Sequence, residues 1–480
     1  MISQQIQRVI VKLFQRVPTG VPELDDAIEG GLPKAGLFLV AGTPGSGKTA
    51  FSARFLFEGI LKGDRGIYVS FAEGRDAFFS ETARNGLDFA KADGDGMFLY
   101  MDLLTVKNEG IPAVTQSIVD AVLDFKASRL VIDSFSAMAQ AVPQLIEARS
   151  ILHTILGKVI RQAECTTLLI SEVPVGTSRL GLGIEEFVAD GVLKFSQKEI
   201  DGRVIRNLVI HKLRGTKIGR RQHMFTLDGG FRMFSPFDSS HPNNGHPYPV
   251  IKNTASHSST GITGLDTILG GGFRRGSHVL LEVGEDVSSP SLMSFLTPII
   301  SNTVKSGDQV ICVPVNGMYP EELQDSLRKS VPEGLASVQI FDITGKGGPN
   351  TVDLGGATVL QPFDMFWKTA KKLRKPENRL LSIIGFDALE ARYAKDLPAM
   401  QGLIVETIAK VRNAGDIIVS IARPFSSTLR ELASASDVHL RLAQYDGVLC
   451  LLGVKPRTDY YCVSHPNYGA LAQIELVQVS

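Results

Sequence analysis

The chain has 480 residues, of which 44% are hydrophobic and 21% are charged, and its 50 basic residues balance its 50 acidic ones. This length is too great for a single core and predicts two large domains. The balanced charge excludes a global positive field that would hold the chain on nucleic acid or on an anionic membrane, although a local patch stays open. Because no apolar run reaches the ~18 residues of a membrane span, we expect a cytoplasmic protein without such a span. The four dispersed cysteines fit reduced core thiols better than metal ligands.

The first half of the chain alternates apolar strand patterns with helical ones. Residues 1–16 carry apolar side chains at helical spacing and predict a helix that packs on the protein or on a partner, with docking on a membrane surface as the alternative. From residue 36 onward, helical stretches separate the runs GLFLVAG, GIYVSFAE, MFLYMDL, RLVIDSF and TTLLISE. Strands that alternate with helices form a mainly parallel sheet flanked by helices, so residues 1–235 are predicted to be an α/β domain.

A glycine-rich loop follows the first of these strands and opens a helix. Its sequence GTPGSGKT fits the pattern GxxxxGKS/T in the strand-to-helix context that the motif needs; the alternative is a glycine turn with a solvated lysine. Glycines let backbone N–H groups surround phosphates, and the helix N-terminus adds partial positive charge. We therefore expect ATP here, with Lys48 on the β and γ phosphates and Thr49 on Mg²⁺. The expected nucleotide-binding residues are Gly42, Thr43, Pro44, Gly45, Ser46, Gly47, Lys48, Thr49 and Ala50.

Two carboxylates near strand ends complete the expected site. Asp133 ends RLVID and is predicted to hold Mg²⁺ through water; the alternative is a strand-end aspartate that caps the next turn. Glu73 ends GIYVSFAE, at the sheet edge where ligands bind in open α/β folds. It is the candidate general base for the attack of water on the γ-phosphate, whereas the competing interpretation is an ordinary surface glutamate.

The chain then passes through a predicted linker, residues 236–258, and repeats itself. The linker is rich in Pro, Ser, Asn and His, and its histidines have no acidic or Cys partner at ligand spacing. TGVPELDDAIEGGL from Thr19 recurs as TGITGLDTILGGGF from Thr260, 241 positions later. A period as long as a domain indicates an internal duplication, so residues 259–480 are predicted to be a second domain of the same fold.

The second copy lacks the phosphate-binding loop. Under the same shift, VGEDVSSPS from Val283 stands where the first copy has GTPGSGKTA. Glu285 and Asp286 bring negative charge to the phosphate position, and Pro290 lacks the N–H of the magnesium-binding position. We therefore expect one nucleotide site per chain and a second domain that serves assembly or partner binding.

Two further second-copy features match the first. Asp387 is expected to be the counterpart of Asp133, although a turn residue explains it as well. KPRT from Lys455 matches KLRGT from Lys212. Lys455 and Arg457 either bind an acidic partner or a neighbouring subunit, or are residual surface charge.

Taken together, these motifs make the chain resemble the KaiC-like branch of the RecA superfamily of P-loop ATPases, as a two-domain member with a degenerate second domain. The resemblance rests on RVPTGVPELDDAIEGGLP, GTPGSGKT, YVSFAE, LVIDS, GIEEFVAD and HKLRGT, and it covers residues 16–235 closely. It implies tandem RecA-like domains in a homo-oligomer, commonly a hexameric ring, with ATP between neighbouring subunits. It also implies that Lys212 and Arg214 reach the γ-phosphate held by the next subunit; surface ion pairing is the alternative. Ser171 and Glu172 would couple that phosphate to the loop after them.

One departure from the family pattern concerns the candidate base. The clock-protein members have two adjacent glutamates after the second strand, whereas this chain has Ala72 and then Glu73. With a single candidate base, we expect slow ATP hydrolysis suited to a switch rather than to a motor. Autokinase activity in those members resides in an active second domain, so none is expected here.

These observations leave several functions open. The first is a regulatory ATPase whose second domain binds a protein partner, and a related alternative is a gas-vesicle synthesis regulator of the archaeal D type that acts on a transcription factor. A DNA recombination or repair ATPase shares the fold, but the zero net charge makes nucleic acid an unexpected partner. A scaffold that binds ATP without hydrolysing it is the remaining alternative.

Overall fold

The structure is a computed structural model of the chain. It describes residues 15–103, 111–136, 161–173, 188–236, 248–343, 351–354, 356, 358–375, 378–464 and 474–479. The chain forms two compact units, the first comprising Met1–Ser235 with Val479–Ser480 and the second Pro236–Gln478. The helix expected in residues 1–16 and the loop expected after Glu172 lie almost entirely outside the described residues.

The first unit is built on a nine-stranded sheet of order β11-β10-β9-β8-β3-β7-β6-β4-β5. Strands β5, β4, β6, β7, β3 and β8 run parallel, and β9 to β11 continue antiparallel. The strands of this unit, in which β1 and β2 pair separately from the large sheet, are β1 (Arg16–Val17), β2 (Leu32–Pro33), β3 (Leu37–Gly42), β4 (Gly66–Ser70), β5 (Phe98–Asp102), β6 (Arg129–Asp133), β7 (Thr166–Glu172), β8 (Gly191–Ile200), β9 (Arg203–Leu213), β10 (Gln222–Thr226) and β11 (Arg232–Met233). Its helices are α2 (Pro22–Ala27), α3 (Lys48–Leu61), α4 (Arg75–Arg84), α5 (Phe89–Gly94), α6 (Ile111–Phe125) and α9 (Arg161–Ala163).

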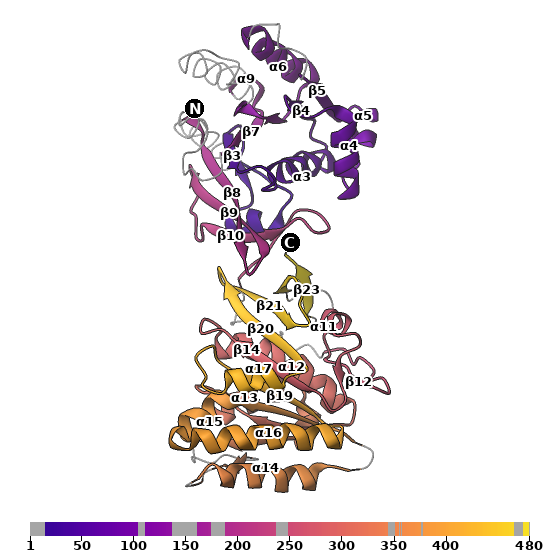
Figure 1. Ribbon diagram of the computed structural model, residues 1–480. Helices are drawn as coiled ribbons and strands as arrows, with labels where there is room; N and C mark the ends of the chain where they lie inside the picture. Colours follow the sequence, from indigo (N-terminus) through magenta and orange to yellow (C-terminus); the bar gives the residue numbers. More distant parts are fainter. Residues whose placement is uncertain are drawn as a thin grey trace, which may run out of the picture. The chain divides into compact units, whose positions relative to one another are not determined.

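Helices cover both faces of this sheet, which is why β3 and β4 are buried along their whole length (Figure 1). One core includes Phe51 and Phe55 of α3, Phe78 of α4 and Phe89 of α5. The other core includes apolar residues of α6 such as Ile118. The mainly parallel α/β fold predicted from the sequence is thereby confirmed.

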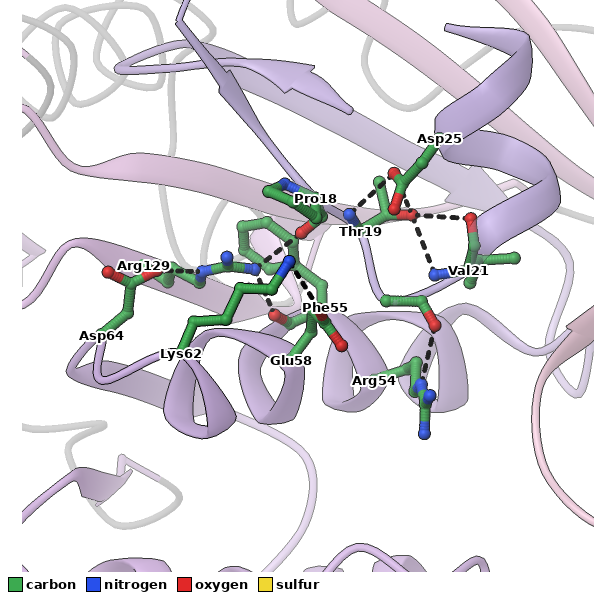
Figure 2. A network of polar contacts seen from close by, with 11 residues as sticks. Pro18, Thr19, Val21, Asp25, Arg54, Phe55, Glu58, Lys62, Asp64 and Arg129 are labelled. Atoms are coloured by element: carbon green, nitrogen blue, oxygen red, sulfur yellow. Dashed lines mark hydrogen bonds and ion pairs between the residues drawn. The ribbon is translucent and has the colours of Figure 1, made fainter. Parts of the chain in front are cut away.

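A buried arginine fastens the start of β6 to α3. Figure 2 shows the Arg129 guanidinium donating to the carbonyl oxygens of Pro18 (2.8 Å) and Phe55 (2.7 Å) and to Asp64 Oδ2 (3.0 Å). It also lies over the Phe55 ring, 4.7 Å from its centroid, and only 1% of Arg129 is exposed. A Cβ atom on Gly59 would come within 2.3 Å of the Arg129 Nε, so α3 approaches the arginine as closely as it does because this position is glycine.

The second unit repeats this plan in a ten-stranded sheet of order β17-β16-β15-β18-β19-β14-β20-β21-β22-β23. Strands β17 to β20 in this order are parallel, and β21 to β23 are antiparallel. Its strands are β12 (His257–Ser258), β13 (Phe273–Arg274), β14 (His278–Val283), β15 (Gln309–Val313), β16 (Val338–Asp342), β17 (Thr351–Asp353), β18 (Leu380–Gly385), β19 (Ile417–Ala422), β20 (Val438–Tyr445), β21 (Val448–Lys455), β22 (Tyr460–Ser464) and β23 (Glu475–Gln478).

Helices flank the second sheet as they flank the first. Apolar residues of α12 and α13 belong to one core, and those of α14, α15, α16 and α17 belong to the other. In Figure 1, α14 and α16 run side by side. The helices are α11 (Thr263–Ile268), α12 (Ser289–Lys305), α13 (Pro320–Ser330), η4 (Pro332–Ser337), α14 (Leu360–Leu373), α15 (Phe386–Arg392), η5 (Ala394–Asp396), α16 (Leu397–Ala414) and α17 (Leu429–Ala435). No helix within the described ranges combines the length and the apolar character that crossing a bilayer requires.

The repeated motif makes the same contacts in both units. Asp25 Oδ1 accepts hydrogen bonds from the Thr19 N–H and hydroxyl, each at 2.8 Å. Asp266 Oδ1 accepts the equivalent pair from Thr260 at 2.8 and 2.6 Å. The tandem RecA-like architecture therefore extends to the hydrogen bonds at the start of each unit.

Part of the stretch expected to be a linker packs on the second unit instead. Tyr248 is buried in its core, and Asn302 of α12 bonds to the backbone of Ile251 in both directions. His257 and Ser258 form β12, paired with β13. Sequence composition misses this because the packing depends on single residues such as Tyr248 and on backbone hydrogen bonds, neither of which needs an apolar period.

Candidate nucleotide-binding site

The glycine-rich loop joins the carboxyl end of β3 to the first turn of α3. Gly45 and Gly47 have φ values of +73° and +94°, in the left-handed region where side chains are strained. A Cβ atom on Gly42 would lie 2.6 Å from the Phe195 carbonyl oxygen and 2.6 Å from Ser46 Oγ. Glycine is therefore needed at these three positions for different reasons, and together they give the tight curve of a phosphate-binding loop.

Lys48 lies folded back on this loop. Its ammonium donates to the carbonyl oxygens of Gly42 (3.0 Å) and Thr43 (2.9 Å). Burial lowers the pKa of Lys48, while the negative charges of Glu172 and Asp133 oppose that shift. An anion placed on the loop would offer the ammonium stronger acceptors than these neutral carbonyls.

Thr49 and Asp133 meet across the junction of α3 and β6. The Thr49 hydroxyl donates to Asp133 Oδ2 at 3.1 Å, and the Tyr68 hydroxyl donates to the same oxygen. Burial raises the pKa of Asp133, and the bonds from Tyr68 and Thr49 and the charge of Lys48 oppose that rise. A carboxylate and a hydroxyl beside a phosphate loop supply oxygen ligands of the type that Mg²⁺ prefers, so the residues present fit this ion.

Glu73 lies just past β4, the strand next to β6, where Ser70 pairs with Asp133. Its backbone is fixed from two sides, because its N–H donates to Ser70 Oγ (2.9 Å) and its carbonyl accepts from the Tyr100 hydroxyl (2.7 Å). Burial is the main cause that raises the pKa of the half-buried Glu73 carboxyl, and the charges of Glu81 and Asp133 add to it. A carboxylate with a raised pKa and a fixed backbone suits a general base.

Ser136 ties the ends of β6 and β7 together. Its hydroxyl lies 3.3 Å from the Ser171 hydroxyl and accepts the Glu172 N–H at 2.8 Å. Since β7 lies between β3 and β6 in the sheet, this contact holds the end of β7 between the loop and Asp133.

Lys212 and Arg214 are not brought to the loop of their own unit. Lys212 pairs with Val192, which pairs with Leu39, and the Arg214 N–H bonds to the carbonyl of Asp190, beside the first residue of β3. The loop instead follows Gly42, the last residue of β3. By the rise of an extended strand, Gly42 is about 10 Å from the level of Lys212 and about 17 Å from that of Arg214. The Lys212 ammonium donates to the Ala189 carbonyl (2.8 Å), and Arg214 pairs with Asp190 (3.5 Å).

Sequence reasoning missed three polar residues around the carboxylates: Tyr68, Ser70 and Tyr100. All three occupy apolar-looking runs that read as buried strand, and their roles follow from which strands are neighbours in the sheet. A usable signal exists in GIYVSFAE, because Tyr68 and Ser70 are two residues apart in the strand and therefore lie on the same face of the sheet.

The corresponding loop of the second unit, residues 284–288, is held by an arginine instead of a lysine. Arg423 follows Ala422, which pairs with Glu282, as Glu172 follows Ser171, which pairs with Ala41. The Arg423 Nη1 donates to the carbonyl of Gly284 at 2.6 Å, and its Nε lies 3.7 Å from Asp387 Oδ2.

The same region differs from the sequence expectation in one respect. Asp387 lies in the first turn of α15 rather than at the end of β18, and it accepts the Asn316 N–H at 3.3 Å. The Ser288 hydroxyl caps α12 by accepting the Ser291 N–H (3.3 Å). The loop of the second unit is thus held by hydrogen bonds with side chains of its own unit.

Comparison with known proteins identifies the family. Residues 17–231 match the family model of the KaiC ATPase domain. A UPF0273 protein of Pyrococcus horikoshii is 33% identical over 229 residues, which are 45% of this chain and 92% of that protein. The chain belongs to the KaiC-like ATPase family of the RecA superfamily. A UPF0273 protein of Thermotoga maritima is 30% identical over 45% of this chain and 93% of its own length.

Two other similarities add detail for this KaiC-like chain. A crystal structure of a KaiC-like protein from Pyrococcus horikoshii matches with 30% identity and a TM-score of 0.42, covering 46% of this chain and 99% of that one. Residues 247–351, at the start of the second unit, match a family model described as GvpD basic region 2.

Proposed function

We propose that this chain is a regulatory ATPase that binds Mg-ATP in its first unit and hydrolyses it slowly, while the second unit serves assembly or partner binding. The observation that carries the proposal is the meeting of Lys48, Thr49 and Asp133 around a loop that requires glycine at three positions. A cation, a hydroxyl and a carboxylate held together in this way match the phosphate and magnesium groups of a nucleotide.

Each residue has a defined part in this mechanism. The N–H groups of residues 45–50 and the Lys48 ammonium bind the phosphates, and Thr49 with Asp133 would hold Mg²⁺, which would offset negative charge on the phosphate oxygens. Glu73 orients the attacking water and takes its proton. Lys212 and Arg214 of a neighbouring subunit stabilise the charge that develops on the γ-phosphate.

The trans position of Lys212 and Arg214 follows from their distance to their own loop. They lie at the amino ends of the parallel strands, whereas the loop lies at the carboxyl end of β3. A head-to-tail contact places the amino ends of the strands of one copy, with Lys212 and Arg214, against the loop of the next copy. Repeated contacts of this kind close into a ring when the rotation between copies permits. We therefore propose a homo-oligomer, with a hexamer as the family form.

The test is ATP hydrolysis by the full chain and by two variants. Lys48→Ala is expected to abolish nucleotide binding, and Glu73→Gln is expected to keep binding but lose hydrolysis by about 10²-fold or more. Lys62→Ala, at the other end of α3, and Glu199→Gln, at an exposed position of β8, are matched controls that should keep activity. Unchanged hydrolysis in both Lys48→Ala and Glu73→Gln would refute this assignment.

The match to GvpD basic region 2 favours one specific regulatory role, that of a gas-vesicle synthesis regulator acting through a transcription factor. In a host that carries a gas-vesicle gene cluster, production of the full chain is then expected to lower vesicle yield. The Lys48→Ala chain separates a role that needs nucleotide from one that does not. An unchanged vesicle yield with the wild-type chain excludes this role and leaves the ATPase assignment intact.

A further inference from the structure

The second unit carries opposite charges at the two ends of its parallel strands. Glu285 and Asp286 are exposed in the loop after β14, at its carboxyl end. Lys455 and Arg457 are exposed at the turn between β21 and β22. Lys455 pairs with His439, which pairs with Leu280, and the chain runs from there toward the amino end of β14. The acidic and basic pairs therefore lie at opposite ends of the strands of one sheet. The level of Leu280 is about 17 Å from Glu285 by the rise of an extended strand, which is longer than the screening length of about 8 Å, so the pairs do not neutralise each other.

The acidic loop is fixed rather than free. Arg423 holds its first carbonyl, that of Gly284, and Asp286 Oδ2 accepts the Gln444 N–H at 3.1 Å. The Ser288 hydroxyl closes the loop by capping α12. The loop backbone and the Asp286 carboxylate consequently stand in one position without the help of a ligand, which lowers the entropy cost of contacting a partner.

The basic turn keeps the placement of the corresponding pair in the first unit. The Lys455 ammonium donates to the carbonyl of Ser436, one residue before Asp437. In the first unit, the Lys212 ammonium donates to the carbonyl of Ala189, one residue before Asp190. The second unit thus retains the edge that carries the trans cations, although its own loop has become acidic.

We propose that copies of this chain join head to tail through their second units, with Glu285 and Asp286 of one copy against Lys455 and Arg457 of the next. The inference rests on the head-to-tail assembly proposed above, but not on nucleotide binding. In the first unit, the negative charge between neighbours comes from the phosphates of the nucleotide. In the second unit, the two carboxylates supply this charge permanently, so the contact forms without nucleotide and weakens with salt.

The test measures self-association of the full chain in the Lys48→Ala background without nucleotide, by sedimentation velocity. Association is expected in low salt and is expected to weaken as salt is raised. Reversing the acidic pair, Glu285→Lys with Asp286→Lys, or the basic pair, Lys455→Glu with Arg457→Glu, should weaken it by more than about tenfold, because like charges then face each other.

Mixing the two reversed chains provides the decisive arm. Each has one intact and one reversed edge, so an alternating assembly pairs every edge with its complement, and association should return. The four changes combined in one chain should restore it as well. Reversal of Asp364 and Glu406, two exposed acidic residues on α14 and α16, is the matched control and should change nothing. Fluorescence of Trp367, the single tryptophan, reports that the second unit stays folded.

Three outcomes would overturn the inference. These are a Lys48→Ala chain that stays monomeric at low salt, reversed chains that associate like their parent, and mixed or combined variants that do not recover. Failure of the proposed function looks different, because it would appear as ATP hydrolysis that survives both Lys48→Ala and Glu73→Gln while nucleotide-free association is unaffected.

Discussion

Two carboxyl groups of the candidate site have pKa values above their ordinary ones, and burial is the first cause in both. The pKa of Glu73 is raised above its ordinary value of 4.5, and the charges of Glu81 and Asp133 add to the shift. The pKa of Asp133 is raised above its ordinary value of 3.8, although the hydrogen bonds from Tyr68 and Thr49 and the charge of Lys48 oppose the rise. Both residues act in the ionised form in the proposed mechanism, so both shifts bring the loss of function closer to neutral pH.

The first prediction concerns the acid limb of ATP hydrolysis. As pH falls, protonation of Glu73 removes the base, so kcat/KM should decline with a midpoint above pH 4.5. Glu73→Gln should flatten this limb in what activity remains, because glutamine does not titrate. Measuring the pH profile at saturating and at low Mg²⁺ separates the two groups, since protonation of Asp133 weakens the apparent affinity for Mg²⁺. A limb that persists unchanged in Glu73→Gln assigns it to another group.

How much of the site the sequence predicts depends on how local each part is. The loop and Lys48 follow from glycines at fixed spacing, and Asp133 follows from its place after an apolar strand. Tyr68 could not be assigned, because its bond to Asp133 joins residues 65 positions apart and exists only through the β4–β6 register. Arg423 was missed for the same reason, since it reaches its loop from 139 positions away. Periodicity predicts elements, but it does not order them in a sheet.

At the scale of elements, the site depends on how α3 and β6 are held together. Lys48 and Thr49 open α3, Asp133 ends β6, and Arg129 lies where β6 begins, against the second half of α3. Its guanidinium bridges the Phe55 carbonyl of α3, the Pro18 carbonyl and Asp64 (Figure 2). The Thr49–Asp133 contact is therefore set by a clamp at the far end of the same two elements.

The second prediction follows from this clamp. Arg129→Leu leaves the Pro18 carbonyl without this donor, and an unsatisfied buried acceptor costs about 1–3 kcal/mol. The loss of the pair with Asp64 adds little, because 39% of that side chain is exposed. In urea denaturation of the full chain, the first unit should therefore unfold at a lower urea concentration. The unfolding midpoint of the second unit, measured by the fluorescence of Trp367, should be unchanged. Arg84→Leu, at the exposed end of α4, is the control and is expected to stay within about 0.5 kcal/mol of the parent.

At the scale of the whole molecule, the proposed active site is shared between copies. In the proposed assembly, the ATP-binding loop belongs to one copy, and Lys212 with Arg214 belongs to the next. A copy that lacks one half of the site is therefore expected to be inactive when all its neighbours lack the same half. The two second units contribute an interface that does not depend on this exchange. Nucleotide then changes one of two contacts between neighbours and leaves the other in place.

An active site that is shared between two copies predicts that two inactive variants restore activity when they are mixed. Lys48→Ala chains have intact trans cations and no nucleotide, and Arg214→Ala chains have an intact loop and a weakened neighbour. Mixed in equal amounts, they should recover about a quarter of the parent activity, the fraction of interfaces that join two intact halves in a random assembly. Steady-state hydrolysis before and after mixing provides the measurement. A site completed within one chain gives no recovery.

The internal arginine of the second unit has a consequence for how the chain responds to energy supply. A folded unit gains stability from a ligand in proportion to RT ln(1 + [L]/Kd), about 2.7 kcal/mol when the ligand is present at 100 times Kd. In the proposed function, the first unit receives this gain from ATP and loses it when ATP is scarce. The loop of the second unit is held by Arg423, which donates to the Gly284 carbonyl, so we expect the stability of this unit to be independent of ATP. We therefore expect starvation to expose the two halves of one polypeptide unequally to proteolysis, with the first half the more vulnerable.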